Sequence, residues 1–177
     1  MNTYIALLRG INVGGHNKIK MKELENIFIE LGFKEVKTYI QSGNVVFKAD
    51  ENLAVSERIE ALLSKEKGLD IKILLIEAGK FGEILRRNPF AGSNFDEKAV
   101  YVSFALANVG EIGRDKVLLK KAESEEIYFS EDAVYFYCPD GYGKTKLSNN
   151  FLETNLKVLL TTRNLNSCRE IEKLATI

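Results

Sequence analysis

The sequence predicts an α+β protein made of two ferredoxin-like βαββαβ units in tandem, a duplication, followed by a C-terminal helix. Strand-type and helix-type hydrophobic patterns follow the same order in both halves of the 177-residue chain, with an offset of about 95 residues. No Pro/Ser-rich linker separates the halves, so we expect them to pack closely. The expected bounds are residues 1–90, including a connecting helix, and residues 91–177.

In the first half, the apolar residues switch between a two-residue and a 3.6-residue period. A β-rich apolar run opens the chain, and a Gly- and Asn-rich loop must follow it. Leu24, Ile27 and Leu31 recur at helical spacing, and Gly32 ends that helix. The predicted strands are 3–8, 36–40, 45–48 and 71–76; the predicted helices are 21–31, 55–63 and a short one at 81–87.

The second half repeats this order. Its predicted strands are 99–105, 126–130, 133–138 and 158–161, and its predicted helices are 111–121, 146–157 and 164–175. Because side chains alternate across a strand, we expect the aliphatic residues to face the helices and the tyrosines to gather on the opposite side. The tyrosines expected to share that type of surface are Tyr4, Tyr39, Tyr101, Tyr128, Tyr135 and Tyr137. They would either pack the two units together or form a ligand groove or base-stacking platform.

The composition is that of an ordinary globular protein, with 45% hydrophobic and 28% charged residues and a formal net charge of zero. It excludes a disordered chain, a coiled coil and collagen. No apolar run approaches the roughly 20 residues of a membrane span, and the N-terminus does not resemble a signal peptide. Two cysteines cannot form a disulfide framework. We therefore expect a cytoplasmic protein with no membrane partner.

The zero net charge hides a segregation of charge along the chain. Residues 1–22 contain four basic residues and no acidic one, and residues 141–169 contain five basic residues and one acidic residue. The rest of the chain is acidic. If the fold brings the two basic segments together, their fields add over about 8–10 Å. The alternative is chance clustering on a solvated surface.

The loop after the first strand is one candidate anion site. Gly10 and Gly15 have the spacing of a phosphate-binding loop, but His16 and Asn17 stand where Lys-Ser/Thr is required, and the segment is not GxGxxG. Glycines let backbone N–H groups converge, and a helix start follows. The alternative is a connector that needs glycines for its turns. The candidate binding residues are Arg9, Asn12, Gly14, Gly15, Asn17 and Lys18.

Two further candidates lie near the C-terminus. Residues 138–145 end in Gly-Lys-Thr, but Cys138 replaces the leading glycine and the expected topology is antiparallel, so we do not expect a true P-loop NTPase. A phosphate nest using Lys144 or Lys146 remains, as does a plain glycine turn. In residues 161–164, Arg163 offers a fork of donors at an expected helix start. Thr162 or Asn164 there would otherwise serve as an N-cap.

Other chemistries lack support in the sequence. One histidine and two distant cysteines do not make a zinc site, so no metal is expected. No nucleophile motif or acid/base pair stands out, which leaves the catalytic residues unknown and an enzymatic role undecided. No cofactor is expected. The predicted topology suits an RNA-recognition module, but the third strand lacks the paired stacking aromatics of that module.

Five segments resemble a bacterial family of uncharacterised proteins known as DUF1697, for domain of unknown function. They are residues 7–15 (LLRGINVGG), 18–21 (KIKM), 39–47 (YIQSGNVVF), 146–149 (KLSN) and 161–164 (TTRN). The resemblance implies two ferredoxin-related units without an added cofactor domain. It implies no established activity, ligand or catalytic residue.

The leading functional hypothesis is a cytoplasmic protein that binds a small phosphorylated or nucleotide-like anion in a basic, Gly/Asn-rich cleft between the two units. The segregated charge and the glycine loops before helix starts favour it. One alternative is weak binding of single-stranded nucleic acid through the tyrosine-rich sheet face. Another is a protein-interaction module. The sequence leaves the oligomeric state open.

Overall fold

The computed structural model describes residues 1–50, 54–92 and 94–176, and it divides into two compact units. The first unit consists of Met1–Gly82 with Glu170–Ile177, and the second of Glu83–Arg169. We expected a division at residue 90 and a C-terminal helix wholly in the second unit. The division instead falls inside a helix, and the end of the chain groups with the first unit.

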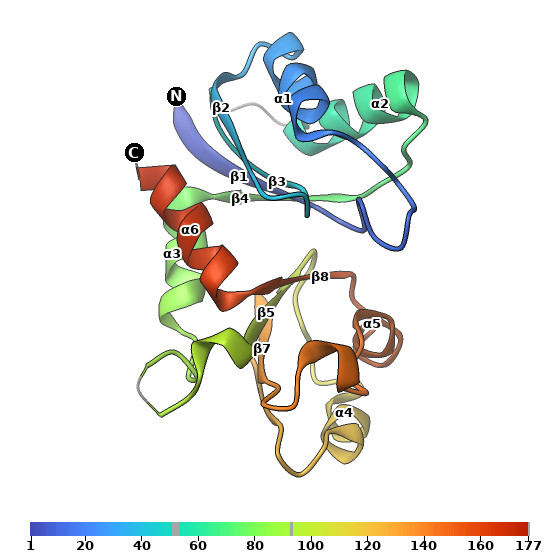
Figure 1. Cartoon of the computed structure of the whole chain (residues 1–177), viewed down its shortest axis with the longest axis vertical. Helices are drawn as coiled ribbons and strands as arrows, with labels where there is room; N and C mark the ends of the chain where they lie inside the picture. The colour runs from blue at the N-terminus through green and yellow to red at the C-terminus, as the bar shows by residue number, and fades with distance from the viewer. Residues whose placement is uncertain (51–53, 93, 177) are drawn as a thin grey trace. The chain divides into compact units, whose positions relative to one another are not determined.

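The first unit holds a four-stranded antiparallel sheet with the strand order β2-β3-β1-β4 (Figure 1). Helices α1 and α2 cover the same face of this sheet. The elements are β1 (Asn2–Leu8), α1 (Met21–Glu30), β2 (Lys34–Tyr39), β3 (Asn44–Ala49), α2 (Val55–Lys67), β4 (Ile73–Glu77) and α3 (Ala78–Arg86), the helix within which the division falls.

The second unit repeats the same arrangement, with the strand order β6-β7-β5-β8 in an antiparallel sheet. A 3-10 turn, η1 (Glu97–Ala99), precedes its first strand. The elements are β5 (Val100–Ala105), α4 (Arg114–Lys120), β6 (Glu126–Phe129), β7 (Ala133–Tyr137), the 3-10 turn η2 (Tyr142–Lys144), α5 (Asn149–Leu156), β8 (Leu160–Asn164) and α6 (Leu165–Thr176), whose last residues group with the first unit.

Each unit therefore has the order βαββαβ and a sheet in which the first strand lies between the third and the fourth. This is the ferredoxin-like topology, and the predicted α+β fold class is confirmed. No helix of the described residues combines the length and the apolar character needed to cross a membrane.

The core of the first unit lies between the sheet and helices α1 and α2. Leu24 and Phe28 of α1 are fully buried and face Phe47 of β3. The rings of Phe28 and Phe47 meet edge to face, with their centroids 5.1 Å apart. This packing fixes α1 against the sheet.

Helix α5 begins later than predicted because Ser148 caps it. The Ser148 hydroxyl accepts a hydrogen bond from the backbone N–H of Phe151, at 3.2 Å, so helical structure starts at Asn149 instead of residue 146. The following strand, predicted at 158–161, runs from Leu160 to Asn164. Residues 161–164 are therefore part of a strand, not a loop before a helix.

The predicted tyrosine face is wrong, because the pairing register places the tyrosines on both faces of the sheets. Tyr101 pairs directly with Phe136, and Tyr135 with Val102, so Tyr101 shares the helix-covered face. Tyr4 likewise packs on the helix-covered face of the first sheet. Tyr135 is fully buried and its hydroxyl donates to the carbonyl of Ile84 at 2.7 Å. These tyrosines do not form one stacking platform.

Candidate functional site

The glycine-rich loop between β1 and α1 folds into a small hairpin. The N–H of His16 donates to the carbonyl of Val13 at 2.9 Å, and the N–H of Asn12 donates to the carbonyl of Asn17 at 3.1 Å. The two residues at the tip, Gly14 and Gly15, have φ values of +56° and +79°. Two consecutive positive φ values are typical of a type I′ turn, which favours glycine. The glycines thus serve the hairpin turn.

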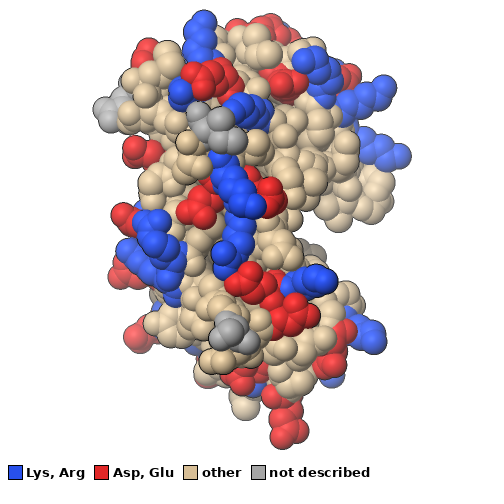
Figure 2. Space-filling view, turned by 60° about the vertical axis from the view of Figure 1, so that its left-hand side comes forward, with Lys and Arg blue, Asp and Glu red and all other residues tan. Residues whose placement is uncertain are grey.

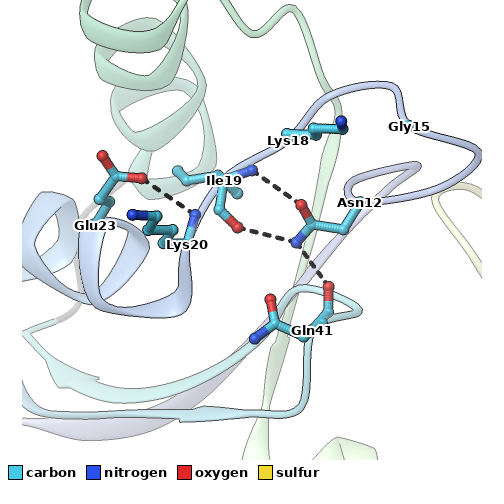
Figure 3. Close-up of a pocket in the computed structure, with 7 residues that line it drawn as sticks. All are labelled: Asn12, Gly15, Lys18, Ile19, Lys20, Glu23 and Gln41. Atoms are coloured by element: carbon cyan, nitrogen blue, oxygen red, sulfur yellow. Dashed lines mark hydrogen bonds between the residues drawn. The ribbon is translucent and has the colours of Figure 1, made fainter.

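The side chain of Asn12 fastens this hairpin to its surroundings (Figure 3). Its Nδ2 donates to the carbonyls of Ile19, at 3.0 Å, and Gln41, at 2.8 Å, and its Oδ1 accepts from the N–H of Ile19 at 2.9 Å. Ile19 lies seven positions and Gln41 29 positions from Asn12, so one amide group joins the hairpin to the start of α1 and to the β2–β3 turn. We call this set of three hydrogen bonds the Asn12 clasp.

The turn between β2 and β3 is held from both sides. Asn44 donates from Nδ2 to the carbonyl of Tyr39 at 3.0 Å, and the Asn12 clasp holds the carbonyl of Gln41. Ile40 lies between these two anchors with a φ of +48°, which is costly for a β-branched residue. Such strain persists only where the surrounding contacts impose it, and it is frequent at binding sites.

A pocket of about 540 Å³ opens beside the Asn12 clasp. A volume of about 300–1,000 Å³ is usual for a small-molecule site. In Figure 3, Lys18 extends toward Gly15, and Lys20 extends toward Glu23 in the first turn of α1. Residues from the hairpin, the start of α1 and the β2–β3 turn line the pocket, namely Asn12, Gly15, Lys18, Ile19, Lys20, Glu23 and Gln41.

The acidic side chain that lines this pocket has hydrogen-bond partners, whereas the two lysines that line it form no ion pair with a described residue. The carboxylate of Glu23 accepts hydrogen bonds from Lys67 Nζ, at 2.9 Å, and from the N–H of Lys20, at 3.2 Å. The hydrogen bond from Lys67 is the main reason that the pKa of Glu23 lies below its ordinary value, and the one from Lys20 adds to it. Lys18 and Lys20 are exposed, and neither forms an ion pair with any residue that the structure describes.

A known protein family matches most of the chain. The family described as "Protein of unknown function (DUF1697)" matches residues 1–135, which is more than half of the chain and includes every residue of the pocket. The chain belongs to the DUF1697 family.

A solved structure of a conserved bacterial protein, SP0830 from Streptococcus pneumoniae, has the same fold as this DUF1697 chain. The two are 24% identical, the alignment covers 98% of each chain, and the TM-score is 0.73. At this identity the similarity concerns the fold alone. No curated protein matches the chain.

Three of the candidate residues predicted from the sequence line the pocket, namely Asn12, Gly15 and Lys18. Gly14 and Asn17 are exposed in the hairpin, where Asn17 Nδ2 donates to the carbonyl of Gly10 at 3.1 Å. Arg9 is half-buried, and its backbone N–H donates to the carbonyl of Lys72 at 3.0 Å. Neither Gly14, Asn17 nor Arg9 lines the pocket.

Lys144, Lys146 and Arg163 all belong to the second unit. Lys144 ends the turn η2, and both lysines are exposed. Arg163 is only 9% exposed, because it lies in β8 instead of at a helix start. Its Nη1 donates to Thr161 Oγ1, at 2.8 Å, and to the carbonyl of Thr162, at 2.9 Å. Burial lowers the pKa of Arg163 to about 10. The expected exposed fork of donors is therefore absent at Arg163.

The two C-terminal segments of the family resemblance meet inside the second unit. Thr162 Oγ1 donates to Asn149 Oδ1 at 3.0 Å and lies 2.6 Å from the hydroxyl of Ser103. Asn149 Nδ2 also donates to the carbonyl of Leu160 at 3.1 Å. This network fastens α5 to β8 and β5. The network gives Asn149 and Thr162 a structural role that requires no ligand.

On the face shown in Figure 2, basic and acidic side chains of the described residues lie next to one another. No group of three His, Cys, Asp or Glu side chains in residues 1–50, 54–92 and 94–176 is arranged to hold a metal ion.

Ile19, Glu23 and Gln41 were not singled out from the sequence as site residues, and Lys20 was treated only as a charge near the candidate loop. Lys20 was counted among the basic residues of segment 1–22 but not placed at a helix N-cap. Gln41 lies in the segment 39–47 that carries the family resemblance. One signal could have indicated Gln41. The Gly/Asn-rich loop follows the first predicted strand, and the segment 39–47 connects two further predicted strands of the same unit.

Cys138 is expected to be chemically inert in the native protein. Burial, with a further contribution from the Glu125 carboxylate, raises the pKa of its thiol to about 11. At pH 8 the thiolate fraction is then about 0.1%. In a Cys168→Ser background, we expect Ellman's reagent to label Cys138 in urea but not in the native protein within minutes. Rapid native labelling would show that Cys138 is accessible and ionised.

Proposed function

We propose that the chain binds a small phosphorylated molecule in the pocket beside the Asn12 clasp. The supporting observation is the position of Lys20 at the N-cap of α1. An N-cap side chain normally carries an oxygen that accepts hydrogen bonds from the first N–H groups of the helix. Lysine has no acceptor atom. Its positive charge also opposes the partial positive charge at a helix N-terminus.

A bound anion would reverse this unfavourable arrangement. It would accept hydrogen bonds from the exposed first turn of α1 and pair with Lys18 and Lys20, which form no ion pair with the described residues. Among the described residues that line the pocket, Glu23 is the only acidic one, and Lys67 and the Lys20 N–H already engage its carboxylate. Phosphate suits such a site, because lysine binds phosphate as a point charge from several directions.

The proposal keeps the small anionic ligand expected from the sequence and assigns it to residues of the first unit alone. Cys138 and Cys168 are both buried, and neither forms a disulfide bond with any described residue. This supports the cytoplasmic location expected from the sequence, since a reducing compartment keeps thiols free.

Calorimetric titration with inorganic pyrophosphate and with ADP tests the proposal. The double variant Lys18→Gln/Lys20→Gln should bind either probe at least about tenfold more weakly than the unaltered chain, because it loses two charge-assisted contacts. The matched control is Lys22→Gln. Lys22 lies in the first turn of α1 but pairs with Glu25 and does not line the pocket.

The control should bind each probe within about twofold of the unaltered chain, because long-range charge alone has a small effect at physiological salt. Equal weakening by the control and by the double variant would show that the response is unspecific. Unchanged binding in the double variant, or no binding of either probe at millimolar concentration, would contradict the proposal.

A further inference from the structure

The segment around α4 in the second unit exposes an unusual amount of apolar surface. Leu119 is 86% exposed, Ile112 67% and Leu118 48%. The opposite side of the helix is anchored in the core through Val117, which is fully buried. Single exposed leucines are common, but three large apolar side chains within eight residues form a patch typical of an interaction surface.

Four charged side chains flank this patch, and the order of acidic and basic residues along the sequence indicates what the patch can bind. They are Glu111, Asp115, Lys116 and Lys120, all exposed, and none forms an ion pair with a described residue. Arg114 points elsewhere. Its Nε donates to the carbonyl of Gly110 at 2.8 Å, and its guanidinium lies over the Phe129 ring, 5.0 Å from the centroid.

The exposed residues of this segment match those of a second copy that runs in the opposite direction. About a point midway between Asp115 and Lys116, each acidic residue has a basic residue at the same distance on the other side. Glu111 corresponds to Lys120, and Asp115 to Lys116, while Ile112 corresponds to Leu119. An antiparallel copy of the segment related by a two-fold axis would therefore place opposite charges and apolar groups against each other.

We infer that α4 and the preceding turn form a homodimer interface, in which α4 packs antiparallel against α4 of a second copy. The inference is independent of the anion pocket. Because one short helix per chain buries little area, the dimer is weak, with a dissociation constant on the order of 0.1–1 mM. The exposed ion pairs make it weaker as salt rises.

Charge reversal tests this inference directly. D115K places a lysine opposite Lys116 of the second copy, and K116E places a glutamate opposite Asp115. By sedimentation equilibrium at up to about 1 mM protein, each variant alone should associate at least tenfold more weakly than the unaltered chain. An equimolar mixture of the two should dimerise again, because every charge then faces its opposite.

The double variant D115K/K116E should also dimerise with itself, for the same reason. Lys22→Glu, in the first unit, is the control with the same change in charge as K116E and should leave association unchanged. Circular dichroism checks that each variant is folded; if D115K unfolds α4, K116E alone still decides, because it leaves Asp115 unaltered.

Three results would overturn the inference. The first is an unaltered chain that stays monomeric at 1 mM protein and low salt. The second is a dimer that persists in both D115K and K116E, which would place the interface elsewhere. The third is a mixture of the folded variants that stays monomeric.

Discussion

Replacing Asn12 with alanine is expected to lower the free energy of unfolding by about 2–4 kcal/mol. The substitution removes the three hydrogen bonds of the Asn12 clasp, and two of them involve both backbone groups of Ile19, which is buried. It also places a Cβ-bearing residue without local hydrogen bonds at a φ of +51°. Urea unfolding followed by circular dichroism measures the loss.

Two controls separate these contributions. Asn12→Gly removes the same hydrogen bonds without the cost of the positive φ, so it should retain most of the loss. Asn17→Ala keeps the clasp and has the same backbone cost, at a φ of +48°, but loses only one exposed hydrogen bond. It should cost about 1–2 kcal/mol. A loss for Asn12→Ala no larger than that for Asn17→Ala would show that the clasp adds little stability.

Gly113→Ala is expected to cost at least about 3 kcal/mol, because a methyl group has no space there. Gly113 is the N-cap of α4 and has a φ of +75°. A Cβ at this position would collide with the backbone oxygen of Asn155 in α5 and lie 2.6 Å from its carbonyl carbon. Backbone atoms cannot relieve the collision by a change of rotamer, as a side chain can. Helix α4 must therefore shift, which draws Val117 out of the core.

Gly68→Ala is the matched control for this substitution. Gly68 is the C-cap of α2, its φ is +65°, and a Cβ there would meet nothing within 4 Å. It shares the backbone cost without the collision, so we expect a loss of only about 1 kcal/mol. Equal losses in the two alanine variants would contradict the close approach of α4 and α5.

Most of the fold could be predicted because it depends on local patterns. Leu24, Ile27 and Phe28 share one face of a helix whatever else the chain does, and they are buried in the structure as the spacing predicts. The faces of the second sheet could not be assigned correctly, since alternation gives two sets of residues but not their orientation. The pairing of Tyr101 with Phe136 decides that orientation, and it is a long-range contact.

The residues that line the candidate pocket were predicted in part, for the same physical reason. Asn12, Gly15 and Lys18 lie within one loop, so a loop-based argument found them together. Gln41 is brought to the pocket by a hydrogen bond across 29 positions of sequence, and no local pattern indicates it. Arg163 was misplaced because its segment looked like a loop before a helix, whereas β5 pairing draws it into β8.

The account depends most on the pocket beside the Asn12 clasp, and a titration of the isotope-labelled chain followed by amide NMR tests it most directly. Inorganic pyrophosphate should shift the backbone amides of Gly15, Lys18 and Gln41 along one saturation curve, because all three border the same volume. The Asn12→Gly variant should lose this response while it remains folded. Shifts confined to other amides, or no shifts up to about 10 mM pyrophosphate, would contradict the account.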